Sequence, residues 1–164
     1  MKKVLIIGAN GGTARILTDR LLDETTDQLV LFLRKADRLA KYESNPRVTL
    51  VDGNVLDTEA LRLAMKDVDI VYSNVGGADL GQQTQSILTA MHEAKQTRLI
   101  FISALGAHHE VPGKFGEWNE QAIAAFLPGF RESAKLLANS VYTTSESAKL
   151  LANSDVVYTE LRPA

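Results

Sequence analysis

Short runs of apolar, often β-branched residues recur along the chain, separated by segments with helical spacing. Such runs are typical of strands buried on both faces of a sheet. They comprise Lys3–Gly8, Gln28–Leu33, Arg47–Asp52, Val68–Ser73, Arg98–Ser103 and Asp155–Leu161. Between them, apolar residues three or four apart predict one face of a helix. These helical stripes are Ile16/Leu17/Leu21, Leu61/Ala64/Met65 and Ile87/Leu88/Met91.

The alternation of strands and helices predicts an α/β fold, namely a Rossmann-like, doubly wound parallel sheet with helices on both faces. Ligands bind such a sheet in the crevice at the carboxyl ends of its strands. A length of 164 residues suits one domain, residues 1–164, with a sizeable core. The apolar run Val4–Ile7 is too short for a signal peptide, and no run approaches a membrane span.

Composition narrows the classes of function. The chain is 45% hydrophobic and 23% charged, as is ordinary for a soluble globular protein, and its net charge is −2. This charge gives no general attraction to nucleic acid or to acidic membranes. Cysteine is absent, which excludes disulfides and thiolate metal sites. We therefore expect a cytoplasmic protein whose partner is a small molecule.

A glycine-rich loop, GANGGTA (Gly8–Ala14), follows the first predicted strand and opens the first helix. Gly8 permits a tight turn, Gly11 lets the backbone approach a pyrophosphate, and Ala14 allows close packing of helix on strand. The helix N-terminus offers unpaired N–H groups to phosphates. In this strand–turn–helix setting the loop predicts a dinucleotide site. The residues predicted to bind are Gly8, Asn10, Gly11, Gly12 and Thr13.

The end of the second strand discriminates between cofactors. Sites for NAD usually place a carboxylate there for the ribose hydroxyls, whereas a 2′-phosphate needs a cation. Here Arg34 and Lys35 end the strand, and a carboxylate comes only at Asp37, which we place inside the next helix. Guanidinium groups bind phosphate well, so NADP(H) is favoured over NAD(H), with Arg34 as its ligand. Lys35 has the alternative role of solvating the strand end.

With these residues placed, the chain resembles an atypical short-chain dehydrogenase/reductase of the NmrA-like, NAD(P)H-binding group. The segments that carry the resemblance are GANGGTA, VDGNVLD, SNVGG, LIFISALG, PGKFGEW, ESAKLL and LRPA. The resemblance implies that Asn54 and Val55 lie at the adenine ring, with Asn54 where relatives commonly have Asp. It also implies that Val75, Gly76 and Gly77 border the adenosine and pyrophosphate. Ser103 would be the active-site serine, and the backbone of the turn at Pro163 and Ala164 would lie near the nicotinamide.

Some of these residues have simpler alternative roles. Gly76 could merely end a strand, and Ser103 could cap its own turn. Phe115 and Trp118 could cover the nicotinamide, although we favour burial that anchors a long loop. His108 and His109 are adjacent and lack helical spacing, so no metal site is expected.

The nine residues ESAKLLANS occur twice, at Glu132–Ser140 and Glu146–Ser154, within a duplicated segment at residues 131–154. Dehydrogenases of this superfamily use Tyr-x-x-x-Lys, in which tyrosine transfers the proton and lysine lowers its pKa. Four residues before Lys135 stands Arg131, and four before Lys149 stands Ser145. The lysine half of the motif is therefore present without its acid. We predict that Lys135 keeps the site, with Lys149 as the alternative.

Three functions remain open. The first is an NADP(H)-binding oxidoreductase that transfers hydride to a small acceptor, flavin-like or quinone-like. The second is a non-enzymatic sensor of the NAD(P)H pool, and the third, less favoured, is a nucleotide-sugar epimerase. Relatives continue past LRPA, so we expect most of the substrate-binding region to be absent from this sequence. Leu127, Phe130 and the repeated leucines could form a homo-oligomer interface, although burial in the core explains them more simply.

Overall fold

A computed structural model describes residues 1–142 and 157–161 of the chain. The strands are β1 (Lys3–Ile7), β2 (Gln28–Leu33), β3 (Val48–Asp52), β4 (Ile70–Ser73), β5 (Arg98–Ile102) and β6 (Val157–Leu161). The helices are α1 (Gly12–Glu24), α2 (Thr58–Ala64), α3 (Leu80–Glu93), α4 (Gly113–Ala122) and α5 (Leu127–Tyr142), with a 3-10 helix η1 (Ala36–Tyr42). Each predicted strand is present.

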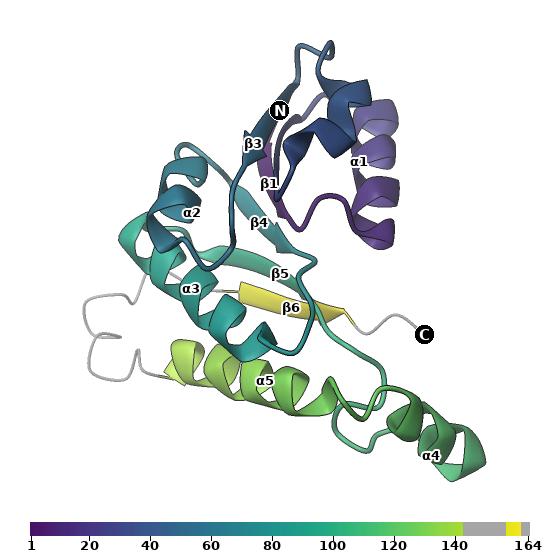
Figure 1. Ribbon diagram of the computed structural model, residues 1–164. Coiled ribbons are helices and arrows are strands. Elements are labelled where there is room, and N and C mark those ends of the chain that lie inside the picture. Colours follow the sequence, from purple (N-terminus) through teal and green to yellow (C-terminus); the bar gives the residue numbers. More distant parts are fainter. Residues whose placement is uncertain (143–156, 162–164) are drawn as a thin grey trace.

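The strands form one parallel sheet with the order β3-β2-β1-β4-β5-β6 (Figure 1). From β1, the chain adds β2 and then β3 on one side of the sheet, and it then crosses back to add β4, β5 and β6 on the other side. The direction in which strands are added therefore reverses between β1 and β4. This reversal opens a crevice at the carboxyl ends of the two strands. The Rossmann-like fold predicted from the strand pattern is confirmed.

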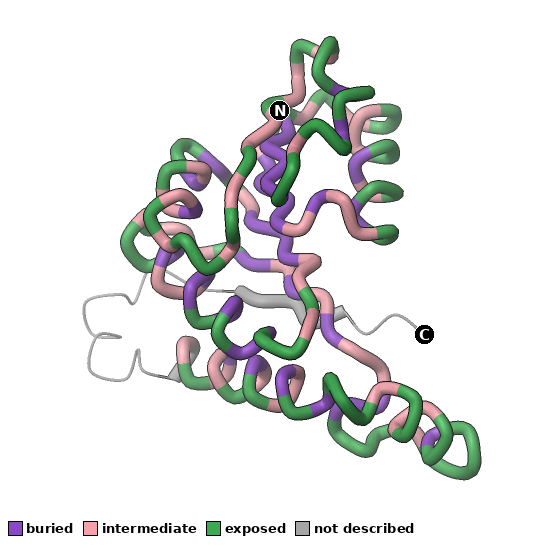
Figure 2. The backbone as a smooth tube through the Cα atoms, in the orientation of Figure 1, coloured by how far each residue is buried: buried purple, intermediate pink, exposed green. Residues whose placement is uncertain are grey.

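Helices cover both faces of the sheet, because alternate strand residues point to opposite sides. Val4 and Ile6 of β1 pack in a cluster with residues of α1 and η1, whereas Leu5 and Ile7 pack with residues of α2, α3 and α5. Figure 2 shows the buried positions concentrated in the central strands and on the inner faces of these helices. Among the described helices, none is long and apolar enough to cross a bilayer.

The helix stripes agree with the sequence pattern, with one correction. Leu61 and Met65 of the second stripe, and Ile87 and Met91 of the third, are buried. In the first stripe, however, Ile16 points to solvent with 64% of its surface exposed. The sheet face beneath α1 is covered instead by its neighbours Leu17 and Leu21, together with residues of η1.

The first copy of the repeated sequence forms the middle of α5, which packs on α3. Ser133 and Leu137 are fully buried there. The hydroxyl oxygens of Ser133 and Thr84 lie 2.8 Å apart across the two helices, and Ser133 also donates to the Gly129 carbonyl. Leu127 is buried within the same chain, as the core interpretation expected.

Candidate functional site

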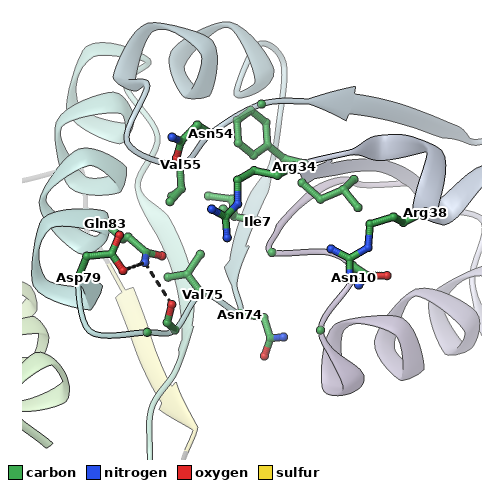
Figure 3. Close-up of a pocket in the computed structure, with 17 residues that line it drawn as sticks. Ile7, Asn10, Arg34, Arg38, Asn54, Val55, Asn74, Val75, Asp79 and Gln83 are labelled. Atoms are coloured by element: carbon green, nitrogen blue, oxygen red, sulfur yellow. Dashed lines mark hydrogen bonds between the residues drawn. The ribbon is translucent and has the colours of Figure 1, made fainter. Parts of the chain in front are cut away.

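A cleft of about 430 Å³ lies at the carboxyl ends of the strands, at the reversal of strand order (Figure 3). It is bordered by the loop after β1, the ends of β2 and β3, the loop after β4 and the start of α3. The residues that line it are Ile7, Gly8, Asn10, Gly11, Phe32, Leu33, Arg34, Arg38, Gly53, Asn54, Val55, Asn74, Val75, Gly76, Gly77, Asp79 and Gln83. The cleft therefore lies where the fold predicts a ligand.

The glycine-rich loop forms the floor of the cleft. Gly8 has a φ of +75°, a conformation that costs any residue with a Cβ, and its N–H donates to the Phe32 carbonyl at 3.0 Å. The N–H of Gly11 then donates back to the Gly8 carbonyl at 3.0 Å, which closes the turn. A Cβ at Gly11 would collide with the Asn74 side-chain amide as it now lies, so Asn74 would have to move away from a larger residue there. Ala14 is fully buried, as close helix–strand packing requires.

Two guanidinium groups line the cleft beyond the end of β2. Arg34 directly follows β2, and Arg38 comes from the 3-10 helix η1. The turn between them passes through Lys35 at a φ of +58°. Both carboxylate oxygens of Asp52 accept bonds from this turn, one from the N–H of Lys35 at 3.2 Å and one from the N–H of Ala36 at 3.1 Å. Asp52 thereby fixes the backbone that presents the arginines.

The η1 helix is also attached to α1. The Tyr42 hydroxyl donates to Asp19 at 2.6 Å, and the Lys41 ammonium lies 3.4 Å from the same oxygen. These two partners, the Tyr42 hydroxyl foremost, hold the pKa of the Asp19 carboxyl below its usual value. Burial, with the hydrogen bond to Asp19, raises the pKa of Tyr42. Arg38 is therefore carried by a short helix fixed at both ends.

Two valines from different loops provide an apolar wall on the other side of Arg34. Val55 follows β3 and Val75 follows β4, and both point into the cleft beside Arg34 (Figure 3). Asn54 adjoins them, and its side-chain oxygen accepts the N–H of Leu56 at 3.1 Å. Because that N–H requires an acceptor, the orientation of the Asn54 amide is set, with Nδ2 left as its donor. A flat apolar group could lie against these valines.

Most of the predicted cofactor residues meet in this cleft. Those that line it are Gly8, Asn10, Gly11, Arg34, Asn54, Val55, Val75, Gly76 and Gly77. Gly12 and Thr13 are exposed in the first turn of α1 and lie outside the lining. Lys149, Pro163 and Ala164 lie outside the described residues. The ligand-binding roles of all these residues remain predictions.

Ser103 and Lys135, the predicted catalytic pair, do not line the cleft. Ser103 follows β5 and is 5% exposed, whereas Lys135 is exposed on α5. The first copy of the repeat lies within α5, and the second lies outside the described residues. A role for Lys135 or Ser103 in catalysis stays a prediction.

The loop that begins at Ser103 is held by a dense set of polar contacts. The Glu110 carboxylate accepts the N–H groups of Gly106 and His108, each at 2.9 Å. Asn119 of α4 donates its amide to the Leu105 carbonyl at 2.7 Å. Three backbone groups of the loop are therefore satisfied by side chains, so the loop has a defined shape at the carboxyl end of β5.

Arg131 occupies the position of the missing tyrosine and binds this loop. Its Nε donates to the Ala107 carbonyl at 2.8 Å, and its Nη2 lies 3.0 Å from Nε2 of His109. Since a guanidinium can only donate, Nε2 of His109 accepts and Nδ1 donates to Glu120 at 2.9 Å. At this position the chain thus has a cation engaged in holding the loop instead of a proton-transferring phenol.

Four polar side chains of the cleft were not predicted from the sequence, and each left a signal. Arg38 is four residues beyond Arg34, in the short helix that follows the strand end. Asn74 directly follows a buried strand at the ligand-binding edge of the sheet. Asp79 and Gln83 are one turn apart at the start of α3, and Gln83 falls on the apolar stripe of that helix, where a polar residue is unusual.

The expected burial of the two aromatic residues in PGKFGEW is wrong. Phe115 and Trp118 are 56% and 62% exposed on α4, with their ring centroids 5.9 Å apart. In Figure 1, α4 projects from the body of the domain beyond α5. The loop before α4 is anchored by the polar contacts of Glu110, Asn119 and Arg131 instead.

Comparison with known proteins identifies the family. Residues 8–164 match the family described as NAD(P)H-binding. The chain belongs to this NAD(P)H-binding family.

Individual members of the wider group agree with this assignment. Eugenol synthase 1 from Petunia hybrida is 30% identical over 110 residues, which cover 63% of this chain and 35% of that protein. The chain thus spans about a third of such curated relatives. A Rossmann-fold NAD(P)-binding protein from Shigella flexneri is 33% identical, with a TM-score of 0.70 over 100% of this chain and 68% of that one.

A short-chain dehydrogenase/reductase from Veillonella parvula, solved in complex with NADP, matches in fold. Its TM-score is 0.79 at 24% identity, over 98% of this chain and 68% of that one. The residues of the cleft are consistent with a nicotinamide dinucleotide in this NAD(P)H-binding protein. A tight turn at Gly8, where the positive φ and the Asn74 backbone exclude a Cβ, suits a pyrophosphate, and the two guanidinium groups suit a further phosphate.

Proposed function

We propose that the chain is the cofactor-binding part of an NADP(H)-dependent oxidoreductase of the atypical, NmrA-like short-chain dehydrogenase/reductase type. When bound, the reduced nicotinamide supplies a hydride, and the acceptor is a small molecule. The observation that carries this proposal is the pair Arg34 and Arg38 on one side of the cleft, next to a carboxylate that is already engaged.

The preference for NADP(H) follows from the charges at the end of β2. A 2′-hydroxyl needs a carboxylate acceptor, whereas a 2′-phosphate needs cations. The carboxylate of Asp52 lies beside the turn after β2, but its two oxygens accept backbone N–H groups of that turn. Arg34 and Arg38 supply two forked donors for phosphate oxygens in the same region. Two guanidinium donors beside a carboxylate that is already engaged therefore favour NADP(H) over NAD(H).

The proposed acceptor is one that can take a hydride without a tyrosine proton donor. Flavin-like, quinone-like and other conjugated molecules meet this requirement, since their reduced forms can be protonated from solvent. Arg131 stands in the tyrosine position, and its donors serve the Ala107 carbonyl and His109. What the chain contributes is then binding and orientation of the dinucleotide rather than acid catalysis at that position.

A titration with NADPH and, in parallel, NADH tests the cofactor preference, using energy transfer from Trp118, the single tryptophan. We expect NADPH to bind at least about tenfold more tightly than NADH. Arg34→Met and Arg38→Met should each weaken NADPH about ten- to hundredfold, because a hydrogen bond to a charged group contributes roughly 1.5–3 kcal/mol. Affinity for NADH should stay the same in both variants.

Arg98→Met serves as the matched control, because Arg98 begins β5 at the opposite, amino-terminal edge of the sheet. This variant should bind both dinucleotides as the unmodified protein does. Equal affinity for NADPH and NADH in the unmodified protein would contradict the proposal. So would an Arg38 variant that weakens both dinucleotides to the same extent.

The engaged Arg131 also favours a second candidate, a sensor that binds NADP(H) without turnover. Both candidates predict the same dinucleotide affinities, so turnover must separate them. Consumption of NADPH in the presence of a flavin or a quinone supports the oxidoreductase. Tight NADPH binding with no consumption across such acceptors supports the sensor.

A further inference from the structure

Gln83 lies at the edge of the cleft in the first turn of α3, three residues after the helix begins at Leu80. It is 7% exposed and lines the cleft, and Figure 3 shows its side chain reaching from α3 to a place beside Asp79. Its nitrogen Nε2 donates to Oδ1 of Asp79 at 2.6 Å and to the carbonyl of Gly76 at 3.1 Å. Both donors of the amide are therefore assigned.

These two contacts fix which end of the amide faces the ligand. A carboxylate oxygen and a backbone carbonyl can only accept, so the atom between them must be the NH₂ group, and a flipped amide would place oxygen against oxygen. Oε1 is consequently the other end. No donor among the described residues bonds Oε1. Gln83 lines the cleft, and its Oε1 is not among the solvent-excluded atoms of the described residues, so this oxygen is free to accept a hydrogen bond from a ligand or water in the cleft.

The surroundings of this acceptor suit a flat heterocycle with an amino group. Val55 and Val75 give the apolar wall of the cleft, and Gly76, which receives one Gln83 bond, is next to Val75 in the same loop. The nearby Asn54 offers a donor, because its oxygen is bound to Leu56. An adenine carries an exocyclic amino donor beside a ring-nitrogen acceptor. A 6-oxopurine reverses this order, with an oxygen and a ring N–H in those places.

We propose that Gln83 selects adenine, its Oε1 accepting a hydrogen bond from the exocyclic amino group of the dinucleotide's base. The inference rests on the proposed function, and it adds a specificity-determining residue on α3 to the residues after β3. Asp79 is a positioning residue in this arrangement, since it holds the Gln83 amide in one orientation. A base with oxygen at the same position would meet the Gln83 oxygen directly.

The test compares NADPH with its deaminated analogue, in which hypoxanthine replaces adenine. The two share the reduced nicotinamide, so the same fluorescence signal follows both. We expect the unmodified protein to bind the analogue at least about tenfold more weakly, the effect of one lost hydrogen bond and an unpaired acceptor. In Gln83→Met, which has a similar shape and no acceptor oxygen, this ratio should fall several-fold, leaving only the discrimination that the Asn54 donor supplies. Thermal unfolding of the variant checks that it is folded.

Asp79→Asn provides the matched control. Its side-chain oxygen can still accept from Gln83, so the ratio of affinities should persist. A ratio that persists in Gln83→Met but is lost in Asp79→Asn would assign the selection to Asp79 and overturn the proposal. An unmodified protein that binds both dinucleotides equally well would overturn it while leaving the proposed function intact. Failure of the unmodified protein to bind NADPH at all would refute the proposed function, and this inference with it.

Discussion

Substitution of two glycines in one loop should separate folding from binding. Gly8 has a φ of +75°, and a Cβ on it would lie 2.6 Å from the Asn74 carbonyl oxygen. That oxygen cannot retreat easily, because the N–H of Asn74 is bonded to the Ile7 carbonyl at 2.9 Å. Gly12 has neither restriction, since a Cβ there would meet no atom within 4 Å. The two sites are four residues apart and chemically identical.

The loss of stability expected for Gly8→Ala is the sum of two contributions. The left-handed conformation costs an alanine about 1–2 kcal/mol. Relieving the overlap disturbs at least one backbone hydrogen bond at this crossing, which adds roughly 0.5–1.5 kcal/mol. The free energy of unfolding should then fall by about 1.5–3.5 kcal/mol, and Tm by roughly 3–14 °C for a domain of this size. Gly12→Ala should be neutral, or should raise the stability by up to about 1 kcal/mol.

Thermal unfolding and NADPH titration on both variants provide the assay. Gly12→Ala keeps the fold, so a loss of NADPH affinity in that variant would place Gly12 against the ligand, as the sequence predicts. An unchanged affinity would remove Gly12 from the site. For Gly8→Ala, a Tm equal to that of the unmodified protein would refute the steric argument, because it would mean that the turn tolerates a Cβ.

Two further predictions concern the contacts that position the site. Tyr42→Phe removes the hydroxyl bound to Asp19, so stability at neutral pH should fall by about 1 kcal/mol, as measured by urea unfolding. Because the pKa of Asp19 is lowered in the folded state, this contribution is present above its ordinary value of 3.8 and is lost as the pH falls below that value, where the two proteins should converge. Arg131→Met should speed amide hydrogen exchange in the loop between β5 and α4, since the bonds to Ala107 and His109 are lost, and should leave the Kd for NADPH unchanged. Unaltered exchange, or stability curves that stay parallel even well below pH 3.8, would contradict these expectations.

The fold and the floor of the cleft were predictable because they depend on local sequence. Continuous apolar runs predict buried parallel strands wherever they occur, and a glycine loop between a strand and a helix has few other uses. The start of α2 also depends on local sequence, since the side chain of its N-cap residue Asp57 accepts the N–H of Ala60 at 3.0 Å. The place of Arg34 in the cleft was also predictable from its position in the sequence, because a residue that directly follows β2 must lie at the carboxyl end of the strands.

The rest of the site depends on which helix surfaces face the cleft, and a sequence without coordinates does not specify this. Gln83 reaches the cleft because α3 begins at the loop after β4 and its first turn points inward. Asp52 carries the carboxylate expected of a ribose ligand, but its two oxygens accept backbone N–H groups of the turn after β2. Trp118 is exposed because polar contacts, rather than aromatic burial, fix the loop before α4.

The repeated sequence itself shows why local identity is insufficient. Its two copies share the serine that meets Thr84 and the leucine that is buried at Leu137, so the nine residues alone cannot account for the place of the first copy in α5. The residues that differ come just before. Gly129 packs so closely that a Cβ there would lie 3.1 Å from Leu80, and the equivalent position before the second copy is Thr143. Arg131 holds the loop after β5, and its equivalent, Ser145, is too short for the same reach. The place of the first copy in α5 is thus set by the residues that precede it.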